Sequence, residues 1–324
     1  MTVMNMVQAL NSALKLELQN NKRVIIMGED VGKDGGVFRV TDNLIKEFGE
    51  DRVIDTPLAE AGIVGTAIGL SINGIKPVCE IQFDGFIYPA FDQLICHAAR
   101  MRNRSRGRFT CPLVVRAPYG AGVKALEHHS ESMEALYAHT PGLKVVIPSS
   151  PYDAKGLLAA AIQADDPIIF LEPKRLYRAI KEEVPDKRYT IELGKANVIQ
   201  EGTDITLIAW GSMVFTAKQA IAQLAGKYSI ELIDLRTLKP MDTKTILSSV
   251  EKTGRCVIVQ EAPSSGGLGS EISARIMEKA LLSLKAPVMR VSGFDTVVPL
   301  AKLEDHYIPT PARVIGAIED VMGF

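Results

Sequence analysis

Short runs of β-branched and other apolar residues alternate along the chain with longer stretches of helical periodicity. In the first half these runs lie at residues 23–27, 53–55, 77–81, 113–116, 145–147 and 168–171. Helices are expected between them at residues 3–19, 59–72, 88–102 and 152–164. Segments of this length suffice for the crossovers that parallel strands require. The alternation therefore predicts an open, mainly parallel α/β sheet.

A charged, proline-bearing stretch at residues 178–189 interrupts this alternation and resembles a linker in composition. The alternation of strand-like runs and helical segments then resumes. Strands are expected at residues 205–210, 230–235, 256–260 and 288–291, with helices between them. The chain has 324 residues, more than a single domain usually contains. We therefore predict two open, mainly parallel α/β domains, spanning residues 1–187 and 188–324.

The charge and the apolar runs exclude several classes of protein. With 37 basic and 38 acidic residues the net charge is -1, so no nucleic-acid partner is expected. No apolar run approaches the roughly 20 residues of a membrane span, so no membrane partner is expected either. An amphipathic pattern begins almost at the N-terminus and leaves no room for a signal peptide, which favours a cytoplasmic protein. The four cysteines lack CxxC spacing, so we expect neither a metal site nor disulfides.

Open parallel sheets bind ligands beyond the carboxyl ends of their strands, so the segments after the strands are the first candidates for a site. Glu60 begins a predicted helix, where the helix dipole favours a carboxylate. In a closed cleft the same group would have a raised pKa and could donate a hydrogen bond to a heteroaromatic nitrogen. Phe86 is either a core aromatic or a platform for a ligand ring. Gln82 either satisfies local backbone groups or binds a ligand.

A long, glycine-bearing segment without periodicity spans residues 116–130 and contains His128 and His129. Loops of this kind often carry function, and imidazole suits proton transfer near neutral pH. A solvated loop histidine is the alternative. Three glycines at positions 62, 65 and 69 share one predicted helix, where each costs about 1 kcal/mol relative to alanine. Close packing against a neighbouring subunit, or internal helix–sheet packing, would compensate.

Several cofactor motifs are absent. There is no GxxxxGK[ST], no HExxH, and no Gly-Asp-Gly followed by the asparagine that holds a magnesium diphosphate. The segment at residues 265–270 (SGGLGS) resembles a dinucleotide loop but lacks its third glycine. A hydride-transferring dehydrogenase is therefore not indicated. Any diphosphate cofactor must be anchored elsewhere.

Over essentially its whole length the chain resembles the beta subunits of heterotetrameric 2-oxo acid dehydrogenases, in the transketolase-like superfamily. The motifs that carry the resemblance are GEDVG at residues 28–32, GGVFRVT at 35–41, DTPLAEAGIVGTAIGL at 55–70, EIQF at 80–83, PGLKVVIPSSPYDAKGLL at 141–158, FLEPKRLYR at 170–178 and IDLRTLKP at 233–240.

The resemblance implies that the first domain is a thiamine pyrimidine-binding domain and the second a transketolase C-terminal-like domain. The first domain would bind the aminopyrimidine of thiamine diphosphate, while an alpha subunit holds the magnesium diphosphate. Glu60 matches the glutamate that hydrogen-bonds the pyrimidine and drives formation of its imino tautomer. Phe86 matches the aromatic packed on that ring. Leu58 and Gln82 match neighbouring cofactor contacts.

His129 matches the family histidine that orients the substrate and assists reductive acylation of the lipoyl group. Here the motif has a second histidine, His128, and Glu131 stands in place of the usual glutamine. The implied assembly is an alpha2-beta2 heterotetramer that docks, through the second domain, on a lipoyl-bearing acyltransferase core.

The runs at residues 170–174 and 137–143 favour a branched-chain 2-oxo acid as substrate. Pyruvate and acetoin relatives share most of the motifs and are alternatives. A further alternative is that the chain is mainly an assembly subunit.

Overall fold

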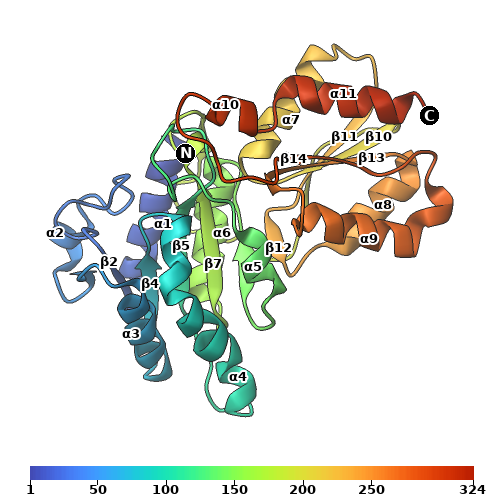
Figure 1. Ribbon diagram of the computed structural model, residues 1–324. Coiled ribbons are helices and arrows are strands. Elements are labelled where there is room, and N and C mark those ends of the chain that lie inside the picture. Colours follow the sequence, from blue (N-terminus) through green and yellow to red (C-terminus); the bar gives the residue numbers. More distant parts are fainter.

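The computed structural model describes residues 1–324. It contains two mainly parallel β-sheets, and helices cover both faces of each sheet (Figure 1). The larger sheet contains β2 (Val24–Gly28), β3 (Val53–Asp55), β4 (Lys76–Glu80), β5 (Val114–Tyr119), β6 (Lys144–Val146), β7 (Ile168–Pro173) and β12 (Thr237–Lys239). Its strand order is β12-β6-β7-β5-β4-β2-β3. Every neighbouring pair is parallel except β12 with β6.

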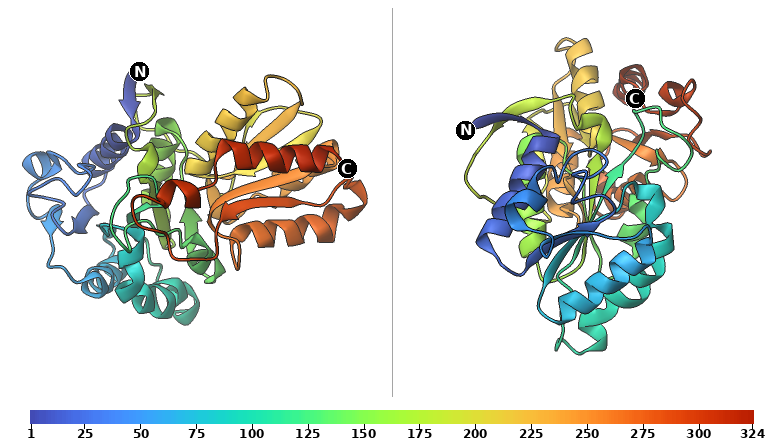
Figure 2. Two further views of the ribbon diagram at one scale, coloured as in Figure 1. Left: turned by 45° about the horizontal axis from the view of Figure 1, so that its top comes forward. Right: turned by 90° about the vertical axis from the view of Figure 1, so that its left-hand side faces the viewer.

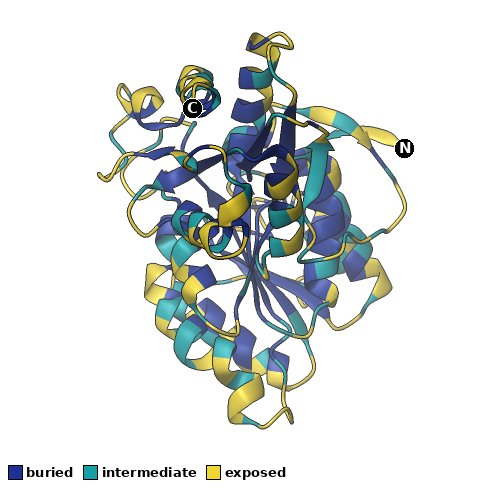
Figure 3. Cartoon of the chain, turned by 90° about the vertical axis from the view of Figure 1, so that its right-hand side faces the viewer, coloured by how far each residue is buried: buried dark blue, intermediate teal, exposed yellow.

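Alternating strand residues bury opposite faces of the larger sheet. Val24 and Ile26 pack with α1 (Met6–Asn20) and α6 (Pro151–Gln163), whereas Ile25 and Met27 pack with α3 (Glu60–Ile72) and α5 (Glu134–His139). This alternation follows from the two-residue period of a strand. A short helix, α2 (Leu44–Phe48), lies between β2 and β3 in the chain. The strands are buried on both sides, and exposure is confined mainly to helix surfaces and loops (Figure 3).

The smaller sheet contains β9 (Asn197–Gln200), β10 (Ile205–Ala209), β11 (Ile230–Asp234), β13 (Cys256–Pro263) and β14 (Met289–Gly293), in the order β14-β13-β10-β11-β9. Only β9 is antiparallel to its neighbour. Helices α7 (Ser212–Gln223) and α11 (Pro311–Met322) cover one face, and α8 (Thr243–Thr253) and α9 (Leu268–Ala280) cover the other (Figure 1). Two short helices, η5 (Leu281–Ser283) and α10 (Glu304–Tyr307), complete this half. The prediction of two mainly parallel α/β domains is confirmed.

The two halves share a core. Strand β12 belongs to the second half of the chain yet pairs with β6 at the edge of the larger sheet. Ile208, Trp210 and Ile233 of the second half lie in the same apolar cluster as Met27 of the first. The two sheets therefore pack against each other through a continuous apolar core. The antiparallel edge strand from the second half was not expected from the sequence.

The expectation of one regular helix at residues 88–102 is wrong. The segment forms a series of distorted turns: η1 (Asp84–Ala90), the π-helical η2 (Gln93–His97), η3 (Ala98–Arg100) and α4 (Met101–Arg104). Pro89 lies inside η1 and has no N–H to donate, so the first turns cannot follow the regular α-helical pattern. Phe86 therefore lies within a 3-10 turn that begins shortly after β4.

Two further expectations are wrong in detail at the N-terminus and in the linker. The first helix begins at Met6, not at residue 3, because Asn5 and Gln8 form a capping box across its first turn. The preceding residues form β1 (Thr2–Asn5), which pairs antiparallel with β8 (Lys181–Val184) inside the stretch expected to be a linker. The N-terminus thus lies beside a segment about 180 positions away, at one side of the molecule (Figure 2).

Candidate functional site

The residues predicted from the sequence lie at the carboxyl edge of the larger sheet. Leu58 and Glu60 follow β3, Gln82 and Phe86 follow β4, and His129 lies in the loop after β5. Strands β3, β2, β4 and β5 are consecutive and parallel, so these segments emerge along the same edge. Helix α3, which begins at Glu60, packs against η1, which carries Phe86.

An aromatic cluster surrounds His129. The ring centroid of His129 lies 4.4 Å from that of Phe83 and 5.0 Å from that of Phe86. The two phenylalanine rings are 5.4 Å apart and nearly perpendicular. His129 Nδ1 is 2.8 Å from the carbonyl oxygen of Glu127, which can only accept, so Nδ1 is the donor. In the neutral ring this leaves Nε2 without a proton and free to accept one.

His128 occupies a different environment from His129. Its side chain is exposed and lies 3.7 Å from Glu131, and its ring is 6.2 Å from that of Tyr88. Its backbone has a φ of 65°, in the left-handed region. Of the two neighbouring histidines, His129 is therefore the one that contacts Phe83 and Phe86.

Glu60 is the first residue of α3, at an N-terminus where no side chain caps the helix. Its carboxylate is half-buried and makes no hydrogen bond or ion pair within the chain. Glu29, which directly follows β2, lies near it. Burial, and then the negative charge of Glu60, raise the pKa of Glu29. Sequence reasoning did not single out Glu29, although it belongs to the GEDVG motif.

The other predicted contacts are also without partners inside the chain. Gln82 is half-buried, and its amide hydrogen-bonds to no other group. Leu58 is 78% exposed. Thr56, two residues before Leu58, has a buried hydroxyl oxygen with no hydrogen-bond partner. The edge thus presents an apolar side chain, a free amide and a free carboxylate, which together can bind a planar heteroaromatic ring.

Buried acidic groups lie beneath the His129 loop. Asp84 accepts hydrogen bonds from the Met133 amide (2.9 Å) and the Tyr137 hydroxyl (2.8 Å), and burial raises its pKa to about 6. Burial raises the pKa of Glu134 to about 7, although the indole of Trp210 donates to one of its oxygens at 3.2 Å. These groups were not predicted, because no local pattern marks them as neighbours.

One buried cation faces this acidic environment. Lys174 lies in η4 (Lys174–Leu176), directly after β7, and its ammonium donates to the carbonyl oxygen of Gly120. Burial lowers its pKa to about 8, against the opposing effect of Glu261 and Asp84. Its nitrogen also lies 5.9 Å from the ring centroid of Phe83. Lys174 therefore links β7 to both the loop and the aromatic cluster.

A cavity of about 810 Å³ lies elsewhere. It is lined by residues that precede β5, β6 and β7, among them Cys111 and Pro167, at the opposite edge of the sheet from His129. The predicted residues and the aromatic cluster around His129 lie at the carboxyl edge instead. No cluster of three or more His, Cys, Asp or Glu side chains is placed to hold a metal ion. No helix is both long and apolar enough to cross a membrane.

Comparison with known families covers nearly the whole chain. Residues 2–180 match the transketolase pyrimidine binding domain, and residues 194–314 match the transketolase C-terminal domain. The chain is 51% identical over 319 residues to the pyruvate dehydrogenase E1 component subunit beta of Acholeplasma laidlawii, covering 98% of each protein. It is equally identical, over 325 residues and the full length of both chains, to the protein of the same name from Staphylococcus aureus.

Among solved structures, the chain is similar to a split-gene transketolase described as an inactive beta4 tetramer. The TM-score is 0.81, the sequence identity is 23%, and the match covers 99% of this chain and 98% of the other. At this identity the similarity concerns the fold alone.

Proposed function

Since the chain belongs to the transketolase-like family of 2-oxo acid dehydrogenase E1 beta subunits, we propose that it forms, with an alpha subunit, the site that decarboxylates pyruvate. The observation that supports pyruvate as the substrate is the 51% identity to pyruvate dehydrogenase beta subunits over the full length. The expectation of a branched-chain substrate receives no support from these relatives. The acyl product would then pass to a lipoyl group on an acyltransferase core.

The cofactor associated with this family is thiamine diphosphate, and the residues at the carboxyl edge suit its aminopyrimidine. Phe86 offers the edge and face of a half-buried ring, while Gln82 and Glu60 offer polar groups that nothing else in the chain engages. The unpartnered hydroxyl of Thr56, two residues before Leu58, is a further polar group in the segment after β3. When bound, the cofactor supplies a carbon nucleophile and an electron sink for decarboxylation of a 2-oxo acid.

Within this site the chain's own residues hold and move protons. Glu60 would hydrogen-bond a ring nitrogen through its carboxyl group, and Leu58 and Phe86 would exclude water from that contact. The free Nε2 of His129 would bind the carboxylate of the substrate when protonated, and would exchange a proton with the lipoyl sulfur during acyl transfer.

An alpha subunit would provide the magnesium diphosphate site, since the chain lacks the Gly-Asp-Gly motif. The exposed face of α3 supports a partner beside the candidate site. A Cβ added at Gly65 or Gly69 would meet no atom of the chain within 4 Å, which rules out internal helix–sheet packing at these two positions. Leu58, just before the helix, is also largely exposed. A partner helix could approach this face closely.

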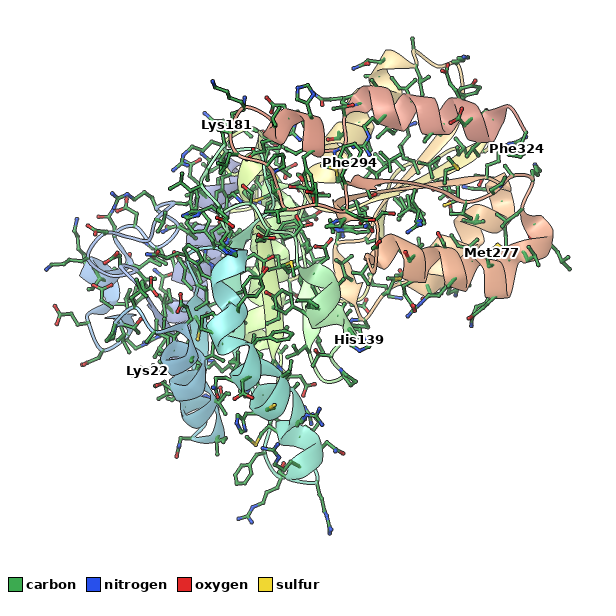
Figure 4. The ribbon with its side chains drawn as sticks, viewed as in Figure 1. Lys22, His139, Lys181, Met277, Phe294 and Phe324 are labelled. Atoms are coloured by element: carbon green, nitrogen blue, oxygen red, sulfur yellow. The ribbon has the colours of Figure 1, made fainter.

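The second domain would dock on the acyltransferase core. Helix α9 and η5 present Met277, Leu281 and Leu282 to solvent, and Leu282 is fully exposed. Met277 lies on α9 (Figure 4). This apolar surface favours an interaction role in addition to the catalytic one.

Co-expression with the alpha chain tests the proposal directly. The purified complex should release carbon dioxide from pyruvate, with a higher kcat/KM than from 3-methyl-2-oxobutanoate. The artificial oxidant assay, which bypasses the core, isolates this half-reaction. A preference for the branched acid would overturn the substrate assignment, and no decarboxylation of either acid by an intact heterotetramer would overturn the function.

A further inference from the structure

The loop that carries His129 is held in an unfavourable backbone conformation. It runs from the end of β5 to the start of α5. Lys124 and His128 have φ angles of 55° and 65°. Left-handed conformations cost a residue with a side chain about 1–2 kcal/mol each. Such conformations persist only where surrounding contacts impose them. The contacts that hold this loop must therefore offset the cost of its backbone conformation.

Carboxylates of the second domain provide several of these contacts. Glu304 Oε1 accepts from the backbone amides of Gly122 at 2.6 Å and Lys124 at 3.1 Å. Its other oxygen, Oε2, accepts from the Ser130 hydroxyl at 3.3 Å. Glu261, at the end of β13, accepts from the Ala121 amide. The first domain contributes the bond from Lys174 to the carbonyl of Gly120.

Glu304 bridges the two ends of the segment that contains His129. One oxygen binds residues before the histidine, and the other binds Ser130 directly after it. The side chain is 1% exposed and forms no ion pair, so the loop donors are what satisfy it. Hydrogen bonds to an ionised group are stronger than neutral ones. Glu304 begins α10, which lies over the loop (Figure 1) and follows the segment that contains Phe294 (Figure 4).

We propose that Glu304 is a positioning residue that holds His129 against Phe83 and Phe86. The second domain thereby sets the geometry of a histidine that the first domain carries. This inference rests on the proposed role of His129 in acyl transfer. A purely structural role for Glu304 would stabilise the chain without a specific effect on that step.

The first test measures the loop itself and does not depend on activity. Hydrogen exchange of peptides covering residues 121–130 would be compared in heterotetramers carrying Glu304→Ala, Glu304→Gln and the wild-type residue. Loss of the acceptor should speed exchange of these amides by about tenfold or more. Because Glu304→Gln keeps one acceptor oxygen, its exchange rates should fall between those of the wild type and of Glu304→Ala. Unchanged exchange in Glu304→Ala would overturn the proposal.

Asp305→Asn is the matched control. Asp305 is the next residue and pairs with Lys124 at 2.7 Å, but both side chains are more than half exposed. Exposed pairs contribute little, so loop exchange should stay at the wild-type rate. Should Glu304→Ala fail to fold, Ser130→Ala removes the Oε2 contact alone. It should speed exchange around His129 and leave exchange elsewhere in the chain unchanged, and no increase around His129 would count against the proposal.

The second test couples Glu304 to His129 in a double-mutant cycle on lipoyl reductive acylation. Displacement of a catalytic group by about 1 Å can cost about 10²-fold, so Glu304→Ala should slow this step by about 10-fold to 100-fold. The double variant should match His129→Ala within about twofold. Additive losses would refute the positioning role. If His129→Ala left acylation intact, the proposed role of His129 would fail, and loop exchange alone would decide whether Glu304 holds the segment.

Discussion

Replacement of Arg116 by methionine should be among the most destabilising single changes in the chain. Arg116 lies between Glu80 and Glu172, and all three side chains are at most 5% exposed. Its Nε and a terminal nitrogen donate to the two oxygens of Glu172, each at 2.7 Å, and it also pairs with Glu80. Tyr177 donates to Glu172 at 2.6 Å. The variant would leave two carboxylates buried without a cation.

The expected magnitude follows from burial. Removing one partner of a buried ion pair costs about 3–5 kcal/mol, because the remaining charge stays desolvated. Arg102 provides the matched control: its Nε is also 2.7 Å from a carboxylate, that of Asp166, but the side chains are 49% and 29% exposed. Loss of such a pair costs about 0–1 kcal/mol. The two arginines therefore separate the effect of burial from the effect of distance.

Urea unfolding of the full chain at neutral pH, followed by fluorescence and circular dichroism, measures both variants. Arg116→Met should lower the midpoint strongly, with an unchanged slope, whereas Arg102→Met should lower it little. Arg116→Lys should lie between Arg116→Met and the wild type, because it keeps the charge but loses the two-nitrogen contact with Glu172. Equal losses from Arg116→Met and Arg102→Met would refute the argument from desolvation.

The pH dependence provides an independent check on the same network. Burial raises the pKa of Glu80 above its ordinary value of 4.5, and Arg116 opposes that rise. Without the arginine the folded-state pKa of Glu80 should rise further, while the unfolded value stays the same. A carboxyl group with a raised folded pKa contributes stability below its unfolded pKa, and this contribution is lost as the pH rises through the folded value. The loss in free energy of unfolding caused by Arg116→Met should therefore become smaller as the pH falls toward 4.5. A loss that stays constant with pH would contradict the reasoning.

Three further predictions concern the proposed function, all with the alpha partner present. Glu60→Gln should leave the affinity for thiamine diphosphate nearly unchanged but slow exchange of the thiazolium proton about 10²-fold to 10⁴-fold, and full exchange would exclude a proton-transfer role. His129→Ala should slow lipoyl reductive acylation more than decarboxylation measured with an artificial oxidant, whereas His128→Ala should have little effect on either, and the reverse order would reassign the histidine. Leu282→Glu should abolish co-sedimentation with the acyltransferase core while the heterotetramer and its decarboxylase activity persist, and retained capture would place the docking surface elsewhere.

Much of the candidate site could be placed from the sequence, because strand ends are local features. Leu58, Glu60, Gln82 and Phe86 follow predicted strands within a few positions, and the parallel sheet brings those ends to one edge. The role of each residue stays a prediction. Phe83 belonged to a quoted motif but was not singled out, since nothing in the sequence distinguishes a ring that packs on His129 from one in the core.

Glu304 could not be found in this way. It lies 174 positions from Ser130 and is buried only because α10 folds over the loop. In the sequence it is an ordinary acidic residue in a polar segment. Glu261 and Lys174 are similar cases, since burial changes their pKa values and burial is a property of the assembled domains.

The sequence by itself determined the local features of this protein: the alternation of strands and helices, the parallel character of both sheets, and the family to which the motifs belong. These follow from periodicity and chain connectivity, which act over a few residues at a time. Tertiary structure alone decided which distant segments meet. Strand β12 joins the larger sheet, β1 pairs with β8, and Glu304 holds a loop of the other domain. Each of these contacts joins groups that are distant in sequence and that gain partners only when the whole chain has closed around its shared core.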